Sequence, residues 1–324
     1  MLHVLLVTFP FFAPVLAGYV AARRGMLALE AIPGLNGFVL FFALPCMLFR
    51  FGAGTPVAQL LDAAAFFTYL LCALIMVGFV VAVSLNRRVG WNDAAFGALV
   101  AAFPNTGFMG VPLLVALLGP AAAGPAIVTI MIDMVLTTSL CIALSRLDGA
   151  DQHGVAQAAR NALRGVLVNP LPWAILLGAL VSALELQLPG PALQTLGLLA
   201  DAASPVALFT IGAVLARSQM RVASDGAPEL PLRDYVPVAF IKLLLHPVLV
   251  LLVGGAAIQL GVPLDRFALT VMVLVAALPS ASNVSLLAEK FGADSGRIAR
   301  IILVSTAVSF LSFSAAVSML TGNP

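Results

Sequence analysis

Two proline-centred stretches, Ala101-Ala102-Phe103-Pro104-Asn105 and Ala276-Ala277-Leu278-Pro279-Ser280, decide how this sequence folds. Each lies inside a long apolar segment that would otherwise continue as one helix. A proline removes a backbone donor and clashes with the carbonyl one turn earlier, so each stretch predicts a helix break. After the first proline, Gly107, Gly110 and Pro112 make an uninterrupted helix still less favourable. The sequence therefore predicts two broken helices.

The composition indicates that the solvent around these helices is lipid. The chain of 324 residues is 62% apolar and 9% charged, with a mean hydropathy of +1.11. Soluble domains carry roughly a quarter charged residues, so this chain lacks the polar groups to cover a globule in water. Apolar segments of about 20 residues, long enough to cross a hydrocarbon core, recur along it. Since the alternating pattern of a membrane barrel is absent, we expect an all-α integral membrane protein.

The apolar segments predict ten transmembrane helices joined by short connections. We expect them at 3–22, 33–51, 62–85, 94–118, 122–145, 166–186, 194–216, 235–258, 266–289 and 296–320. Two polar stretches, 146–164 and 217–234, are expected to be longer connections, and neither has room for a separate soluble domain. On this division the broken helices are the fourth and the ninth.

The distribution of basic residues predicts the orientation. If the amino terminus lies outside, the outer loops hold Arg50 and Arg266, and the inner loops hold thirteen Lys and Arg residues: Arg23, Arg24, Arg87, Arg88, Arg146, Arg160, Arg164, Arg217, Arg221, Arg233, Lys290, Arg297 and Arg300. Basic residues follow the first apolar run and do not precede it, which predicts a retained first span and not a signal peptide. We therefore expect a multi-pass protein of the cell inner membrane with both termini on the outer, periplasmic side.

The two halves of the chain resemble each other. Ala43-Leu44-Pro45-Cys46-Met47-Leu48-Phe49 matches Ala203-Ser204-Pro205-Val206-Ala207-Leu208-Phe209, 160 residues later, and the two proline breaks are 175 residues apart. A unit of five spans is odd in number, so its second copy enters the membrane inverted. We expect a first repeat at 1–145, a cytoplasmic connecting loop at 146–165 and a second, inverted repeat at 166–324.

Polar residues accompany both breaks. In lipid, irregular backbone persists only where it is buried in protein or lines a cavity. A half-helix that begins in mid-membrane offers unpaired amides and a positive dipole end, which suit an anion. The candidate substrate-binding residues are Asn105, Thr106, Gly107, Ser280, Ser282 and Asn283, beside the helix-breaking Pro104 and Pro279. The alternative is a pair of ordinary proline kinks.

Ionisable residues inside spans are costly and tend to be functional. Asp133, near the centre of the fifth span, could carry a proton, bind a coupling cation or pair with a partner. Lys242 shares one face of the eighth span with His246; it could attract an anion, or extend its ammonium to the inner surface. We interpret His246 as a core residue and Asp201 as interfacial.

Cys46, Cys72 and Cys141 have no metal-ligand spacing, so no metal site is expected.

These residues resemble the auxin efflux carrier family, which includes plant PIN-like carriers and a bacterial malonate-permease-like branch. The most specific stretch runs from Phe103-Pro104-Asn105-Thr106-Gly107-Phe108 to Met109-Gly110-Val111-Pro112-Leu113. Asn36-Gly37-Phe38-Val39, Lys242 through Pro247, and Leu278 through Asn283 with Ala288-Glu289-Lys290 are similar to further landmarks of the family. The resemblance covers essentially the whole chain, although the ninth-helix break departs in detail from plant sequences.

The resemblance implies ten helices in two inverted repeats whose fourth and ninth helices cross, as in bile-acid symporter and NhaA-like folds. It implies alternating access of the elevator type, small organic carboxylates such as malonate or auxin-like acids as substrates, and a homodimer. By the same resemblance, Asn105 is the first residue expected to contact a substrate carboxylate.

The leading functional hypothesis is a secondary active transporter of carboxylate anions that is proton-linked or driven by the anion gradient. A sodium-coupled symporter is the first alternative, and a channel or a non-transporting membrane sensor the second. The sequence lacks hydrolase motifs, nucleotide-binding fingerprints and phosphate loops. We therefore expect no enzymatic activity, no cofactor and no nucleic-acid partner.

Overall fold

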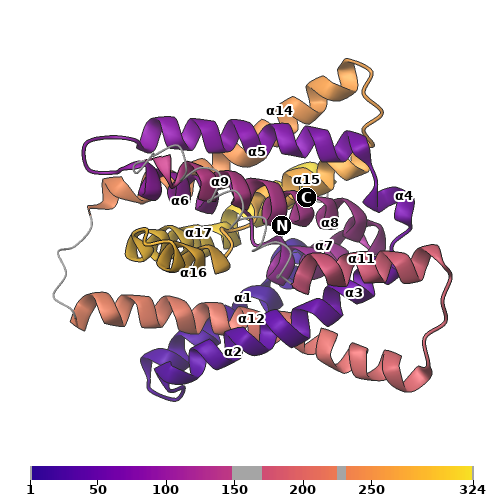
Figure 1. Cartoon of the computed structure of the whole chain (residues 1–324), viewed down its shortest axis with the longest axis horizontal. Coiled ribbons are helices and arrows are strands. Elements are labelled where there is room, and N and C mark those ends of the chain that lie inside the picture. The colour runs from indigo at the N-terminus through magenta and orange to yellow at the C-terminus, as the bar shows by residue number, and fades with distance from the viewer. Residues whose placement is uncertain (1, 148–169, 225–230, 323–324) are drawn as a thin grey trace. The chain divides into compact units, whose positions relative to one another are not determined.

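The computed structural model describes residues 2–147, 170–224 and 231–322 (Figure 1). Every regular element in these ranges is a helix, and an isolated antiparallel bridge pairs Pro104 with Ser280. Six described segments are long and apolar enough to cross a membrane: Leu29–Gly54, Ala63–Ser84, Pro120–Leu144, Gly190–Arg217, Val236–Gln259 and Ser295–Thr321. Shorter apolar helices occur at Thr106–Leu118, Pro170–Ala183 and Arg266–Ala277. The expected all-helical membrane protein is confirmed.

The helices form two compact units, and each unit draws on both halves of the chain. The first unit (Met1–Asp62, Gly107–Ile127 and Asn169–Pro228) contains α1 (Leu2–Arg23), α2 (Ile32–Phe38), α3 (Leu44–Gly54), α4 (Val57–Leu60), α7 (Val111–Leu118), α11 (Pro170–Ala183) and α12 (Gly190–Ser224). The second (Ala63–Thr106, Val128–Val168 and Glu229–Pro324) contains α5 (Ala63–Ser84), α6 (Trp91–Ala102), α9 (Thr138–Leu144), α13 (Val236–Phe240), α14 (His246–Gln259), α15 (Arg266–Ala277), α16 (Asn283–Lys290) and α17 (Ser295–Thr321). Helix α8 (Ala123–Met131) contributes to both units.

One expected connection is partly helical. Helix α12 continues to Ser224, so the stretch expected as a loop at 217–234 begins as a helix, and a turn follows at Leu232–Asp234. Arginine, glutamine and methionine between 217 and 221 are good helix formers, so a change to polar residues does not end the helix. Most of the connecting loop expected at 146–165, including Arg160 and Arg164, lies outside the described residues.

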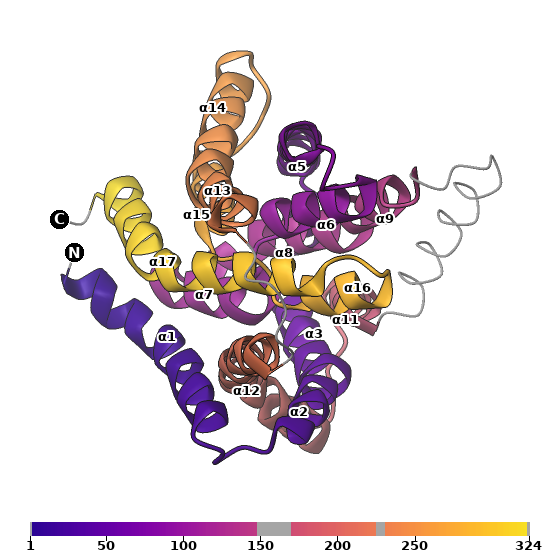
Figure 2. The ribbon, with the colours of Figure 1, turned by 90° about the vertical axis from the view of Figure 1, so that its left-hand side faces the viewer.

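In the first unit, α1 and α12 pack backbone against backbone (Figure 2). A Cβ atom added to Gly18 would lie 1.8 Å from the carbonyl oxygen of Phe209. A Cβ atom added to Gly212 would lie 1.8 Å from the carbonyl oxygen of Val15. Because no side chain fits in either place, glycine is required for this approach, which is a common device of helix packing in membranes.

The packing of α3 on α11 repeats this pattern. A Cβ atom on Gly178 would lie 2.3 Å from the carbonyl oxygen of Phe49, and one on Gly52 would lie 2.7 Å from that of Ile175. Each of these four residues is 160 residues from its counterpart in the α1–α12 pair, which is the offset of the sequence repeat in the second and seventh spans.

In the second unit, two half-helices are buried on all sides. Helices α6 and α15 are each 12 residues long and consist almost entirely of apolar residues. All residues from Ala94 to Ala102, and all from Val271 to Ala277, are buried. A helix that is apolar all round is surrounded by protein, so α6 and α15 form the centre of this unit. Each of them ends at one of the breaks predicted from sequence.

The described helices contain four π-helical turns, at Val39–Ala43, Thr106–Gly110, Ile132–Thr137 and Ile241–Leu245. Three of them end two residues before a proline, namely Pro45, Pro112 and Pro247. A wider turn tolerates the missing N–H of the proline. It also moves the carbonyl one turn earlier away from the proline ring. The turn at Ile132–Thr137 has no such proline and contains Asp133. Since π-helical turns are frequent at functional sites, Asp133 is singled out by its backbone as well as its charge.

The close approach of α1 and α12 can be tested with Gly212→Ala. The added methyl group meets the Val15 carbonyl, so we expect overpacking to destabilise the fold by about 1–3 kcal/mol. Gly78→Ala in α5 is the control, because a Cβ atom there meets nothing within 4 Å. Thermal unfolding, followed by labelling of the free thiols of Cys72 and Cys141 as they become exposed, measures both variants. Equal unfolding temperatures would contradict the packing.

Candidate functional site

Both helices are interrupted at the predicted prolines. Helix α6 ends at Ala102, and the chain becomes helical again at Thr106. Helix α15 ends at Ala277, and α16 begins at Asn283. Between the half-helices, each chain runs extended for a few residues, and these two extended segments meet.

The two breaks are joined by backbone hydrogen bonds. The amide of Asn105 donates to the carbonyl of Pro279 at 2.8 Å, and the amide of Ala281 donates to the carbonyl of Phe103 at 2.9 Å. Pro104 and Ser280 thus face each other in an antiparallel pair. Facing residues of this kind donate nothing to each other, so the missing N–H of Pro104 costs no bond.

The two prolines do not face each other across this junction. The sequence aligned Pro104 with Pro279, whereas the structure pairs Pro104 with Ser280. The amide of Ser280 points out of the pair and donates to the Ser305 hydroxyl oxygen of α17 at 3.2 Å.

The side chains predicted to bind substrate are buried to different degrees. Asn105, Thr106 and Ser280 are buried, while Gly107, Ser282 and Asn283 are half-buried. The hydroxyl of Ser280 has no hydrogen-bond partner among the described residues although it is buried. A buried polar atom without a partner is uncommon in native proteins and is a candidate for contact with a ligand. The backbone bonds bring Asn105 and Ser280 to the same junction, whereas Gly107 belongs to the turn that follows.

Asp133 is completely buried, and each of its carboxylate oxygens accepts a hydrogen bond. Its Oδ2 accepts a hydrogen bond from the Tyr69 hydroxyl at 3.0 Å, and its Oδ1 accepts one from the Thr137 hydroxyl at 3.1 Å. The hydroxyl of Thr138 donates to the Asp133 carbonyl at 2.7 Å and satisfies part of the widened turn. Tyr69 belongs to α5, so Asp133 links two helices of the second unit.

Lys242 is completely buried, so the alternative in which its ammonium extends to the inner surface is wrong. Its Nζ donates to the carbonyl of Ala276 at 2.6 Å and lies 3.1 Å from His246 Nδ1. In a continuous helix the Ala276 carbonyl would accept from the amide of Ser280, four residues on. Because that amide is bonded to Ser305, Lys242 supplies the missing donor, and its charge also suits the negative end of α15.

Asp133 and Lys242 belong to one buried polar cluster with Tyr69, Thr137 and His246. The rings of Tyr69 and His246 lie 6.1 Å apart, and the charges of Asp133 and Lys242 interact electrostatically. No ion pair joins these two side chains within the described part of the chain. Only one ring nitrogen of His246 has a hydrogen-bond partner, because its buried Nε2 has none in the described ranges.

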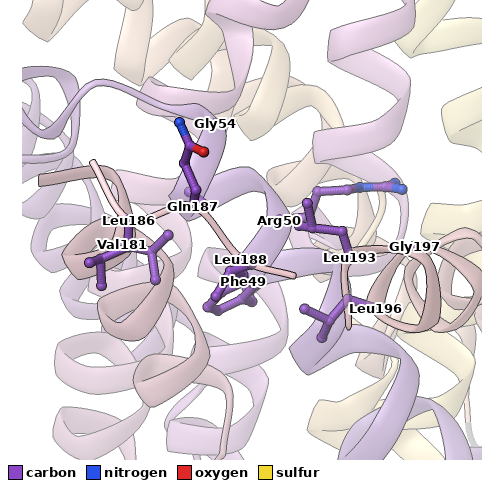
Figure 3. Close-up of a pocket in the computed structure, with 11 residues that line it drawn as sticks. Phe49, Arg50, Gly54, Val181, Leu186, Gln187, Leu188, Leu193, Leu196 and Gly197 are labelled. Carbon is purple, nitrogen blue, oxygen red and sulfur yellow. The ribbon is translucent and has the colours of Figure 1, made fainter. Parts of the chain in front are cut away.

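A separate cavity lies wholly within the first unit (Figure 3). It has a volume of about 540 Å³ and is lined by the ends of α3 and α11, the start of α12 and the connection between α11 and α12. Its lining is mostly apolar and includes four leucines, with Arg50 and Gln187 as the polar side chains. None of the substrate-binding residues predicted from sequence lines it. The Arg50 guanidinium donates to exposed Asp201 at 2.7 Å, which agrees with an interfacial position for that carboxylate.

Two functional contacts were missed by sequence reasoning. Ser305 is one of several serines in an apolar span, and Tyr69 is an ordinary aromatic residue of α5. Nothing in the residue types marks them, because their roles follow from contacts with residues 25 and 64 positions away. A polar side chain on an otherwise buried helix face was the one available signal.

A family model described as membrane transport protein matches residues 3–317. The chain belongs to this family. The match confirms the resemblance to the auxin efflux carrier family, and it spans both breaks and the buried polar cluster.

Curated relatives match along nearly their whole length. A Rhizobium meliloti protein named "Putative malonate transporter" is 29% identical over 302 residues, 93% of this chain and 90% of that protein. The "Uncharacterized transporter YfdV" of Escherichia coli K12 is 28% identical over 317 residues, 94% of this chain and 92% of that protein. An "Uncharacterized transporter" of Methanothermobacter thermautotrophicus is 27% identical over 299 residues, 92% of each chain. The chain is therefore a membrane transporter of this family.

The support of the second break by α17 can be tested with Ser305→Ala. The substitution leaves the buried amide of Ser280 without a partner, so we expect a loss of about 1–3 kcal/mol of stability. Ser309→Ala is the matched control, since that buried hydroxyl bonds within its own helix, to the Thr306 carbonyl. Thermal unfolding of the purified variants measures the difference. If Ser309→Ala lowered the unfolding temperature as much, Ser305 would have no special role.

Proposed function

We propose that the chain is a secondary active transporter of small carboxylate anions, which bind at the junction of the two helix breaks. The observation that carries this proposal is the junction itself. Two interrupted helices meet there by backbone bonds, and the Ser280 hydroxyl is buried beside them without a partner. Transporters commonly bind substrates at discontinuous helices near the middle of the membrane.

The chemistry of the junction favours an anion. Each break is followed by a new helical segment, whose first amides have no partner within that helix. These amides and the positive end of the helix dipole attract a carboxylate. In this proposal Asn105 and Ser280 donate hydrogen bonds to the substrate, and Thr106, Gly107, Ser282 and Asn283 line its surroundings. The positive charge of Lys242, which is bonded to the Ala276 carbonyl one turn before Ser280, adds to the attraction.

Malonate is the first substrate to test. The Rhizobium meliloti relative carries malonate in its name, and the relatives match over almost the whole chain. At 29% identity the relative supports a class of substrate for this chain, the small carboxylates, better than it supports one individual compound. Auxin-like acids, which the family resemblance implies as substrates, are carboxylates as well.

We infer ten transmembrane helices in two inverted five-helix repeats, 1–145 and 166–324. The glycine contacts of α1 with α12 and of α3 with α11 support this, since they recur at one offset of 160 residues. Equal lengths of α6 and α15 add support from the other unit. The distribution of basic residues supports an amino terminus outside, and with it the proposal that both termini lie on the periplasmic side of the inner membrane.

We further propose alternating access of the elevator type, in a homodimer. The second unit contains both breaks and the buried polar cluster, so it would be the moving part. The first unit, with its glycine-dependent helix crossings, would be the scaffold. Transport would be proton-linked or driven by the anion gradient.

Sodium coupling is the second candidate, because Asp133 and freed backbone carbonyls are ligands that a hard cation accepts. Uptake of labelled malonate into proteoliposomes with and without sodium separates the two. A strict sodium requirement would favour the symporter. Complete absence of uptake would favour a sensor, and uptake that does not saturate would favour a channel.

The substrate contact can be tested with Ser280→Ala. Since the Ser280 hydroxyl has no partner in the described structure, its removal should leave the unfolding temperature unchanged. Loss of a hydrogen bond to a charged substrate should weaken malonate binding by roughly tenfold or more. Malonate titration and thermal unfolding of the same preparation measure both effects. Asn105→Ala should weaken malonate binding in the same way.

Thr270→Ala is the control, because this hydroxyl lies on α15, the half-helix that precedes Ser280, and bonds to the Arg266 carbonyl. Its malonate affinity should equal that of the unaltered protein. If Ser280→Ala and Asn105→Ala both bound malonate normally, the site would be misplaced.

A further inference from the structure

We propose that Asp133 and Lys242 form a charge-balanced pair that makes binding of an anion at the breaks require the uptake of one proton by Asp133. This inference rests on the proposed function and adds its coupling. It follows from the contacts of the two side chains and from the cost of net charge inside a membrane protein.

The contacts of Asp133 are those of a carboxylate. Both of its oxygens accept hydrogen bonds, Oδ2 from Tyr69 and Oδ1 from Thr137. A protonated carboxyl group would donate through one of these oxygens, and one of the two hydroxyls would then have to turn away. The observed arrangement therefore suits the negatively charged form.

The contacts of Lys242 are those of an ammonium group. Its Nζ donates to the Ala276 carbonyl at 2.6 Å and lies 3.1 Å from His246 Nδ1. An imidazole that accepts at Nδ1 is neutral and carries its proton on Nε2. With Lys242 as the donor in this contact, Lys242 is positive, His246 is neutral, and the cluster holds one charge of each sign.

No further charge is seen near the pair in the described helices. Helix α5 contributes Tyr69 and Cys72, α9 contributes Cys141, and all three are neutral side chains at physiological pH. Helices α15 and α17 contribute the Ala276 carbonyl and Ser305. The net charge of the empty cluster is therefore zero.

An anion at the breaks would disturb this balance. Uncompensated charge is expensive in a low dielectric, so a bound carboxylate with Asp133 still ionised leaves one negative charge in excess. If a proton from the same aqueous side binds a carboxylate oxygen of Asp133, an O–H bond forms there. The Lys242 charge then faces the substrate anion. For a monoanion the loaded and empty states then carry equal net charge. Malonate, a dianion at neutral pH, brings one further negative charge, which would face the positive ends of the half-helices.

Proton uptake can be measured by calorimetric titration of the purified protein with malonate, at pH 7 and above where free malonate is fully ionised, in buffers of different ionisation enthalpy. We expect one proton taken up for each malonate bound, with an affinity that falls by up to about tenfold per pH unit. Asp133→Asn imitates the protonated carboxyl group, so it should bind malonate with no proton uptake and little dependence on pH. Asp201→Asn, which alters an exposed carboxylate, should behave like the unaltered protein.

Binding without proton uptake by the unaltered protein would overturn the inference. Undiminished proton uptake by Asp133→Asn would do so as well. Failure of malonate to bind at all would instead count against the proposed function.

The charge balance can also be tested without substrate. Lys242→Met leaves the Asp133 charge uncompensated, so we expect the unfolding temperature to fall by about 5 °C or more. Adding Asp133→Asn removes the remaining charge and should recover at least half of that loss. If the double variant lost as much in unfolding temperature as the two single variants together, the two charges would not compensate each other. That result would overturn the inference even if malonate bound with proton uptake.

Discussion

In a bilayer, every backbone amide and carbonyl must find its hydrogen-bond partner within the protein, and the second unit is built around this constraint. Pro104 and Pro279 interrupt two buried helices and release groups that no lipid can satisfy. The released groups bond to each other across the junction, and Ser305 and Lys242 take up two more. The interruption is therefore a closed arrangement of partners, with the Ser280 hydroxyl left over for a ligand.

The same constraint explains why a costly charge lies at the centre of the unit. A buried lysine would ordinarily be expensive, but here it replaces a backbone donor at the negative end of α15. Its charge then needs an opposite one nearby, and Asp133 supplies it with the help of Tyr69 and Thr137. In the proposed mechanism, structural support of the break and sensitivity to protons reside in the same few side chains.

The sequence predicted the breaks well because a proline in an apolar span has a local and unavoidable effect. It also predicted the membrane environment, which depends on composition alone. It could not predict the pairing of Pro104 with Ser280, because a shift of one residue is decided by contacts between distant segments. Ser305 and Tyr69 escaped notice for the same reason. The end of α12 was misplaced because polarity was taken as the end of a helix.

The central claim is that an anion binds where the two breaks meet. The most direct test is a structure determined with bromomalonate, whose bromine gives an anomalous signal that locates the substrate. The signal is predicted next to Ser280 and Asn105, with a carboxylate within hydrogen-bond distance of the Ser280 hydroxyl. A signal confined to the cavity beside Arg50 and Gln187, with the junction empty, would contradict the claim.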